Sequence, residues 1–419
     1  MPDSIQRKAI DLLRWSEKYT KTDMVYLASG GFWLMLGYAG QMLMGLALAV
    51  VLASLLPKSA YGTYQFVIAV CAIIGGLTLS GMGTALMRSI ARGSQGTLSY
   101  AFRTQLVWSS GIILGGGGLA AYYFINGNIG LATAFLVCGA LMPFLSGFSL
   151  YRPYLEGKKL FRESTTLGLW RRPLPVIAVV TAVFFTQDPI ILVITYFASH
   201  TVSMGLLYWI VSKKYPEPAS PNPELLNYSK HLSVMGIMNI ITNNIDKMLV
   251  FHYLGAAPVA AYALAQLPLM QLHKMFGLIG SLIFPKFAQR DFGILRKTLF
   301  HKTLVFSLAT TATVAVYIIT APYIFKLLFP AYPEAILLSQ VLILALLVKP
   351  ATLYSQVFAA HGLKHVQHFL QYSTALLKIV LLIVLLPIYG LWGAVWSTLI
   401  ISLYWAPVVA ILFYARHAE

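Results

Sequence analysis

Six basic side chains interrupt apolar stretches that would be too short to cross a bilayer without them. One acid, Asp246, accompanies them, and Asn243 and Asn244 lie just before it. A charge at membrane depth is costly, so such residues usually face a polar cavity or a charged partner. The excess of bases predicts a cavity for an anionic ligand, with Asp246 and the asparagines as candidates for coupling or gating. The bases are Arg171, Arg172, Lys247, Lys274, Lys349 and Lys378.

Arg171 and Arg172 are the best candidates for binding a phosphate group. A guanidinium binds phosphate oxygens through paired hydrogen bonds and stays charged when buried. The apolar run that follows, Pro173 to Phe185, covers only about 20 Å of a hydrocarbon core about 30 Å thick. The helix must therefore begin upstream and draw the arginines into the membrane. Adjacent residues point about 100° apart on a helix, so one arginine can face a cavity; snorkelling to the headgroups is the alternative.

Asp246 and Lys247 are neighbours in the chain and do not face each other on a helix. We therefore expect Asp246 to pair with a base on another helix, with Lys274 or Lys378 as the candidates. A fixed bridge between helices and a coupling or gating role are both open. Lys349 lies near the middle of its apolar stretch and is another candidate for the cavity, whereas Lys378 can also snorkel.

The composition predicts a polytopic α-helical membrane protein. The chain has 419 residues, of which 58% are hydrophobic and 10% are charged, and its mean hydropathy is +0.74. Soluble domains are about 25% charged. The apolar residues form long blocks instead of the alternation that a β-barrel needs. The net charge of +17 lies in short loops and not on one soluble face, which argues against nucleic acid as a partner.

Twelve stretches meet the length of about 20 apolar residues that a spanning helix needs. Lys and Arg concentrate in alternate connections, and only Lys58 and Lys326 lie in the others. Because basic loops stay in the cytoplasm, both termini are predicted to be cytoplasmic, in the cytoplasmic (inner) membrane. The predicted spans are 26–56, 62–88, 102–126, 129–152, 164–186, 189–211, 230–254, 257–285, 302–327, 333–360, 365–387 and 390–414.

The chain divides into two halves of six spans. Residues 1–24 are predicted to form an amphipathic helix on the membrane surface, with a solvated tail as the alternative. The N-terminal bundle is expected over 25–212, a Pro-rich cytoplasmic linker over 213–228, and the C-terminal bundle over 229–415. Leu56–Tyr64 resembles Leu254–Tyr262, and Gly157 resembles Gly362 in position. These matches predict two bundles related by an axis along the membrane normal.

Three motifs in order resemble the polysaccharide-biosynthesis (oligosaccharide/O-antigen type) flippases of the multidrug/oligosaccharidyl-lipid/polysaccharide (MOP) exporter superfamily. The motifs are Leu55–Tyr64, the segment Asn243–Val250 with His252–Gly255 and Tyr262, and Pro387–Ala394. The resemblance implies alternating-access transport of a polyprenyl-pyrophosphate-linked oligosaccharide for cell-surface polysaccharide. It also implies membrane lipids, and other polysaccharide-assembly proteins, as partners.

Two other functions stay open at this point. A MOP-type multidrug antiporter would need acids for organic cations, and one intramembrane acid among six bases argues against it. The first span, from Val25 to Leu56, also lacks the acid that is typical of many cation-coupled members. A membrane-embedded glycan polymerase or ligase would need a sizeable charged outer loop, which the chain lacks. No nucleotide-binding motif or nucleophile constellation is visible, and His361, His365 and His368 are predicted to form a solvated face. We therefore expect a transporter without metal or cofactor, with the coupling ion, H+ or Na+, left open.

Overall fold

The computed structural model describes residues 24–93, 97–171, 173–216, 223–288 and 292–415, and this part of the chain is helical without strands. The predicted surface helix over 1–24 and Arg172 therefore lie outside the described residues, apart from Met24. The N-terminal half comprises α2 (Met24–Leu55), α3 (Lys58–Gly75), α4 (Met82–Ala91), α5 (Thr97–Trp108), α6 (Ser110–Ile125), α7 (Ile129–Phe148), α8 (Tyr151–Gly157), α9 (Phe161–Arg171), α10 (Pro173–Phe185) and α11 (Pro189–Lys214).

The C-terminal half has fewer, longer helices. It comprises α12 (Pro223–Leu254), α13 (Ala256–Ala288), α14 (Phe292–Leu328), α15 (Glu334–Leu342), the 3-10 helix η1 (Ile343–Ala351), α16 (Thr352–Ala360), α17 (Lys364–Tyr389) and α18 (Leu391–Ala415). Each of the twelve predicted spans coincides with one helix or with consecutive helices. Two boundaries differ by more than five residues: α12 begins at Pro223, inside the segment expected as a linker, and α14 begins at Phe292 instead of 302.

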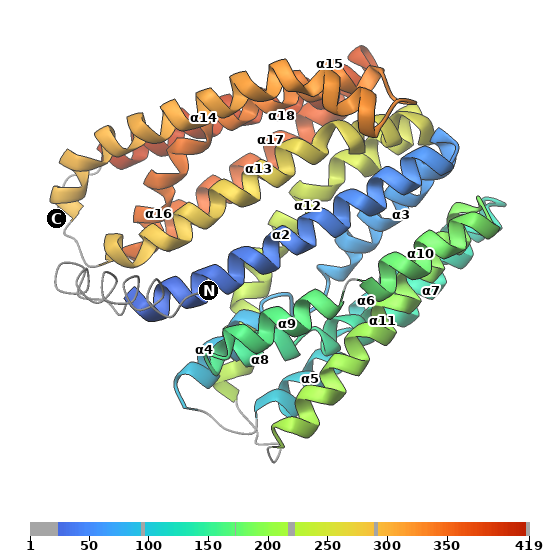
Figure 1. Ribbon diagram of the computed structural model, residues 1–419, viewed down its shortest axis with the longest axis horizontal. Coiled ribbons are helices and arrows are strands. Elements are labelled where there is room, and N and C mark those ends of the chain that lie inside the picture. Colours follow the sequence, from blue (N-terminus) through green and yellow to red (C-terminus); the bar gives the residue numbers. More distant parts are fainter. Residues whose placement is uncertain (1–23, 94–96, 172, 217–222, 289–291, 416–419) are drawn as a thin grey trace, which may run out of the picture.

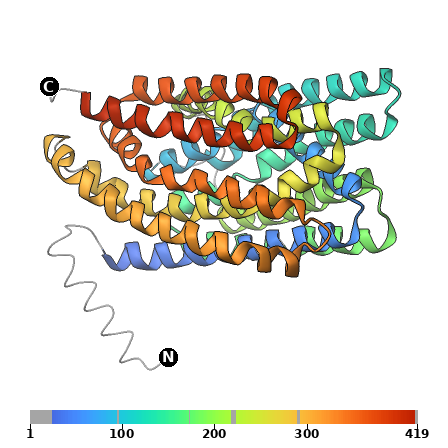
Figure 2. The ribbon, with the colours of Figure 1, turned by 90° about the horizontal axis from the view of Figure 1, so that it is seen from above.

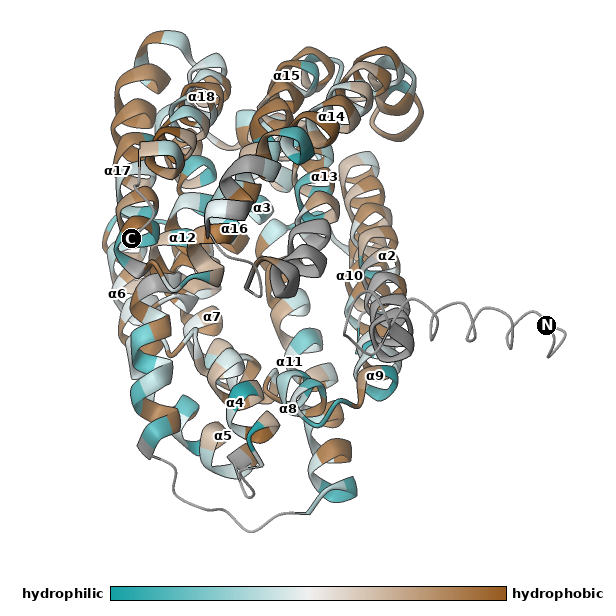
Figure 3. Ribbon diagram, turned by 90° about the vertical axis from the view of Figure 1, so that its left-hand side faces the viewer, coloured by the Kyte–Doolittle hydropathy of each residue, from teal (hydrophilic) through white to brown (hydrophobic). Residues whose placement is uncertain are grey.

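Seven helical stretches of the described chain are long and apolar enough to cross a membrane, and Ala39–Leu55 is a shorter apolar helix. The protein is thus an all-α, multi-pass membrane protein, and the count of twelve spans fits it. Figure 3 shows hydrophobic residues over α14, α17 and α18, which lie on the outside of the molecule. The seven stretches are Ile129–Gly157, Phe161–Phe185, Pro189–Lys214, Thr298–Leu328, Glu334–Ala360, His365–Tyr389 and Leu391–Ala415.

The two halves form two groups of helices that run roughly along the long axis (Figures 1 and 2). Helices α2, α3 and α12 lie between the groups, where α3 packs against α12 and α13. We call the end that carries Pro57, Gly127 and Gly255 the weakly charged end, and the end that carries Arg92 and Lys158 the basic end. In Figure 1 the groups converge at the weakly charged end, to the right, and diverge toward the basic end.

The buried core follows the same division. One apolar cluster contains residues of both halves, from Leu52 on α2 to Val395 on α18. Two separate clusters lie toward the basic end. One joins α4, α5, α8 and α11 around Tyr154 and includes Leu225 of α12, and the other joins α14, α16 and α18 around Phe358. Burial of apolar surface therefore ties the halves together mainly toward the weakly charged end.

The predicted repeat places equivalent residues on equivalent helices. Tyr64 is the seventh residue of α3, counted from Lys58, and Tyr262 is the seventh residue of α13, counted from Ala256. Both tyrosines are buried. Gly157 ends the helix before α9, and Gly362 lies in the turn before α17, with a left-handed φ of 70°. The symmetry axis itself stays a prediction.

Candidate functional site

The buried acid sits in a polar cluster of the C-terminal half. The Asp246 side chain on α12 is 1% exposed, and Lys378 Nζ on α17 lies 3.4 Å from its Oδ2. The same oxygen accepts hydrogen bonds from Gln266 Nε2 at 2.6 Å and from the Tyr262 hydroxyl at 3.1 Å. The ammonium also donates to the Thr242 carbonyl. The expectation that Asp246 pairs with a base on another helix is confirmed, and that base is Lys378.

Lys247 points to a different partner. Its backbone N–H donates to Asp246 Oδ1 at 2.9 Å, but its Nζ donates to Gln65 Oε1 of the N-terminal half at 3.3 Å. Gln65 Nε2 in turn donates to the Tyr61 hydroxyl at 2.9 Å. The side chains of Asp246 and Lys247 therefore contact different halves, because adjacent residues on a helix point in different directions.

Arg171 ends α9 and is half-buried. Its carbonyl accepts a hydrogen bond from the Ser203 hydroxyl of α11 at 2.8 Å. Its Nε is buried and has no hydrogen-bond partner among the described residues, and the same holds for the nearby Tyr151 hydroxyl. Arg171 lies within electrostatic range of that hydroxyl. A buried donor without a partner costs stability, so this pair has unused capacity for an anionic ligand.

The remaining predicted residues are dispersed. Lys274 and Asn243 are exposed, and Asn244 is half-buried with its amide bonded to the Ile240 carbonyl at 2.8 Å. Lys349 lines a cavity of about 210 Å³ with His273 and Trp405. A second cavity of about 370 Å³, whose lining residues include Thr242 and Thr374 next to the Asp246–Lys378 pair, shares Trp405 with it. The structure thus brings Lys247 and Lys378 to either side of Asp246 but does not gather all the bases at one point.

An aromatic cavity of about 190 Å³ lies toward the weakly charged end, lined by the N-terminal half and by Leu267 of α13. Sequence reasoning missed this cavity. Its side chains are uncharged, so burying them in the membrane has no large desolvation cost that would mark them as functional. Tyr61, Tyr64 and Gln65 share one face of α3, and Tyr196 and His200 lie one turn apart on α11. That helical spacing is the only sequence signal. The lining residues are Gly45, Leu48, Ala49, Leu52, Tyr61, Tyr64, Gln65, Ile68, Val176, Tyr196, His200 and Leu267.

Close contacts hold the halves together at the weakly charged end. A Cβ built on Gly62 of α3 would lie 1.7 Å from the Ala256 carbonyl oxygen of α13, so only glycine fits this approach. Lys58 Nζ pairs with Glu334 Oε1 at 2.6 Å, and the Tyr61 and Tyr332 rings meet edge to face at 6.4 Å. The Phe66 and Phe251 rings stack with centroids 3.8 Å apart. The two halves are therefore in close contact at this end.

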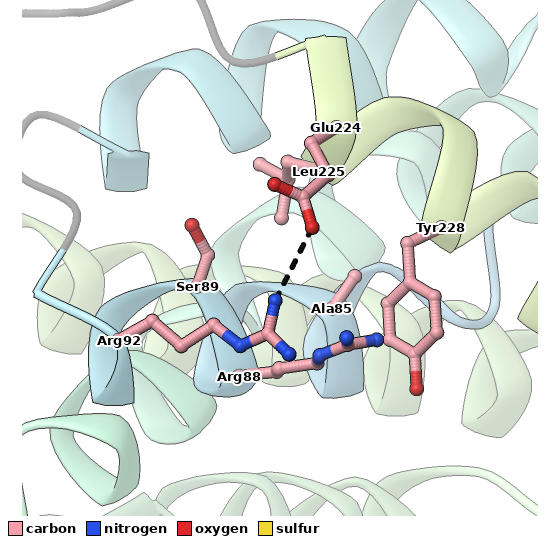
Figure 4. A pocket seen from close by; sticks show the side chains of 7 residues that line it. All are labelled: Ala85, Arg88, Ser89, Arg92, Glu224, Leu225 and Tyr228. Carbon is pink, nitrogen blue, oxygen red and sulfur yellow. Dashed lines mark hydrogen bonds and ion pairs between the residues drawn. The ribbon is translucent and has the colours of Figure 1, made fainter.

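A second contact joins the halves at the basic end, where α12 packs against α4 through Leu225 and the Gly81–Ser233 hydrogen bond, and where two arginines at the C-terminal end of α4 contact α12 (Figure 4). Arg88 of α4 lies over the Tyr228 ring of α12 at 4.2 Å, and Arg92 pairs with Glu224 at 3.3 Å. Both members of the ion pair are exposed. Such exposed pairs contribute little stability, in contrast with the packed backbone contact at Gly62.

Comparisons with solved structures define the fold. An inward-facing multidrug resistance MATE family transporter of the MOP superfamily matches with a TM-score of 0.67 and 14% identity, over 90% of this chain and 95% of that one. An outward-facing multidrug resistance MATE family transporter of that superfamily matches at 0.63 and 15%, over 93% and 95%. A MOP superfamily transporter from Pyrococcus furiosus, titled for the reverse polarity of its binding pocket, matches at 0.63 and 15%, over 93% and 96%. The chain therefore has the fold of MOP-superfamily transporters.

The particular family follows from the sequence. The family model described as "Polysaccharide biosynthesis protein" matches residues 27–290, more than half of the chain. The chain belongs to that family. The comparison with curated proteins gave no match.

Proposed function

We propose that the protein is a flippase that moves a polyprenyl-diphosphate-linked oligosaccharide across the cytoplasmic membrane for cell-surface polysaccharide. The observation that carries the proposal is the charge arrangement. Asp246 is the one buried acid in the part of the chain that the structure describes, and Lys378, Gln266 and Tyr262 already hold it. Arg171 keeps a buried donor without a partner among the described residues. The free binding capacity of the membrane interior is cationic and suits a diphosphate.

The geometry supports a path for the headgroup between the halves. Arg171 and Tyr151 lie toward the basic end, and Lys247 lies deeper, where it contacts Gln65 across the interface between the halves. A diphosphate that moves past these side chains exchanges water for cationic donors, which avoids the cost of an unpaired anion in low dielectric. The polyprenyl chain stays in lipid, and the glycan occupies the space between the halves.

The multidrug antiporter is the second candidate, and the fold favours it as much as the flippase. An organic cation would need an accessible acid, whereas Asp246 is 1% exposed and ion-paired. The family match to polysaccharide biosynthesis also favours the flippase.

The test is complementation of a glycan-export defect, with membrane abundance measured in parallel. Arg171→Ala combined with Arg172→Ala is expected to abolish export, because the buried diphosphate of the cargo would lose its cationic partner at a cost of about 3–5 kcal/mol. The abundance of the variant in the membrane is expected to be unchanged. Arg171→Lys should keep part of the activity, since it retains the charge and loses the bidentate geometry. Arg103→Ala, at an exposed arginine, is the matched control. Normal export by the double alanine variant would contradict the role of these arginines.

A further inference from the structure

We propose that the aromatic cavity of the N-terminal half binds a sugar ring of the cargo, with the pyranose faces against Tyr64 and Tyr196 and its hydroxyls toward Tyr64, Gln65 and His200. The inference rests on the proposed function and deepens it, because it assigns a place to the sugar next to the diphosphate.

The cavity has the chemistry of a sugar-binding site. The Tyr64 and Tyr196 rings meet edge to face at 6.1 Å, and the Tyr196 and His200 rings lie 4.2 Å apart. A pyranose has apolar C–H faces and a polar rim of hydroxyls. A concave site with aromatic walls and a few convergent polar groups complements both.

The Tyr64 hydroxyl is available for a ligand. It has no hydrogen-bond partner among the described residues, although the residue is only 4% exposed and lines the cavity. Tyr262, its equivalent in the repeat, donates to Asp246. Because Tyr64 lines the cavity, its hydroxyl can form a hydrogen bond to a ligand there.

The repeat shows how this cavity differs from its counterpart. Leu56 matches Leu254, an offset of 198 residues, and the same offset carries Leu48, Tyr64 and Ile68 onto Asp246, Tyr262 and Gln266. All three N-terminal residues line the cavity. In the C-terminal half the equivalent positions are filled by the ion-paired cluster. The N-terminal half therefore holds apolar side chains and open volume where the C-terminal half holds a satisfied polar network.

Charge decides between a sugar and an organic cation, which an aromatic cavity can also bind. No Asp or Glu lines the cavity. Lys247 reaches its Gln65 at 3.3 Å, and Arg171 lies next to Ser203, one turn from His200 on α11. A cation would be repelled by these side chains. A sugar attached to a diphosphate places a neutral ring in the cavity and its anion near the bases.

The experiment compares two probes on the full chain in lipid nanodiscs. One is a ten-carbon isoprenyl diphosphate, and the other is the same molecule carrying a single glucose or N-acetylglucosamine. We expect the sugar to tighten binding about five- to tenfold, the scale of one aromatic wall with a hydrogen bond. Tyr196→Ala combined with Tyr64→Phe should bring the ratio of the two dissociation constants to about one. These changes should leave binding of the sugar-free probe unchanged.

Control variants separate this inference from the proposed function. Arg171→Ala should weaken both probes alike and keep their ratio. Tyr323→Ala, at a tyrosine that is 74% exposed, should change neither constant. Tyr196→Phe keeps the ring and should keep the ratio, whereas Tyr64→Phe alone removes one proposed hydroxyl contact and should lower the ratio; this single change decides the matter if the alanine variant fails to fold.

Three outcomes would overturn the inference. They are a ratio of one in the unaltered protein for both sugars, a ratio that survives in the double variant, or displacement of the glycosylated probe by tetraphenylphosphonium, which would assign the cavity to cations. In each case binding of the sugar-free probe would leave the flippase proposal standing. Failure of both probes to bind would remove the two proposals together.

Discussion

A buried carboxylate keeps its charge in a membrane protein only when nearby groups compensate it. At Asp246 the compensation comes from the Lys378 ammonium on another helix and from two hydrogen-bond donors of α13, Gln266 and Tyr262. The cluster therefore connects α12, α13 and α17 through one oxygen atom. Its arrangement fits a structural bridge, and the coupling or gating role of Asp246 stays a prediction.

The Asp246–Lys378 pair yields a stability prediction. Asp246→Asn or Lys378→Met should each lower the free energy of unfolding by about 3–5 kcal/mol, because each leaves the partner charge buried and unpaired. The double variant should cost less than either single change, since it removes both charges. Denaturant unfolding of the purified protein in detergent measures the three values. Glu224→Gln at the exposed pair with Arg92 is the control, with an expected loss of at most about 1 kcal/mol. Additive losses in the double variant would show that the pair is not coupled.

At the residue scale, the sequence could predict the charged members of the site and not the neutral ones. Arg171, Lys247 and Asp246 stood out because a charge within an apolar stretch is costly. Tyr64, Tyr196 and Gln266 carry no such signal, and tyrosines in a membrane span are usually packing residues. The pairing of Asp246 with Lys378, rather than with Lys274, depends on which helices are neighbours, which sequence periodicity does not determine.

At the scale of the helices, α3 and α13 make the closest approach between the halves, at Gly62. Gly62→Ala should destabilise the protein by about 1–3 kcal/mol, because the added methyl would meet the Ala256 carbonyl and the backbones would have to separate. It should also loosen the weakly charged end, where Lys58 meets Glu334. Thermal unfolding and glycan export measure the two effects.

Gly117→Ala in α6 is the matched control for this prediction. Nothing lies within 4 Å of a Cβ built there, and alanine favours a helix by up to about 1 kcal/mol over glycine. The control variant should therefore be neutral or slightly more stable. Equal stability of the Gly62→Ala and Gly117→Ala variants would contradict the contact between α3 and α13.

The helices themselves were largely predictable, because spans of about 20 apolar residues have a clear signal. The breaks within spans were not. The segment between α3 and α4, Gly76–Gly81, and the break at Ser109 between α5 and α6 lie inside predicted spans. Tertiary contacts fix such breaks. The backbone N–H of Gly81 donates to the Ser233 hydroxyl of α12 at 2.9 Å. This contact joins segments that are far apart in the sequence, and the local sequence of neither segment predicts it.

At the scale of the molecule, the two ends of the passage between the halves differ. The shared apolar core and the Gly62 contact join the halves at the weakly charged end. Toward the basic end the buried core is divided into two clusters, and α12 of the C-terminal half joins the N-terminal one through Leu225, the Gly81–Ser233 hydrogen bond and the Arg88–Tyr228 contact. If the basic end is cytoplasmic, as the loop charges predict, the core that both halves share and the Gly62 contact lie on the side away from the leaflet where a lipid-linked glycan is made.

That orientation is the last prediction. The connections at the weakly charged end hold few Lys and Arg residues, and Lys58 among them is paired with Glu334 at 2.6 Å. The positive-inside rule therefore places the weakly charged end outside.

A cysteine at exposed Asn126 should react with a membrane-impermeant maleimide in intact cells, and a cysteine at Ser220 should react only after the cells are opened. Asn126 is preferred to Gly127, whose φ of 76° favours glycine. The native Cys71 and Cys138 are buried and free, so they should add little background. Reversal of the two labelling results would invert the topology and would remove the diphosphate path from the cytoplasmic leaflet with it.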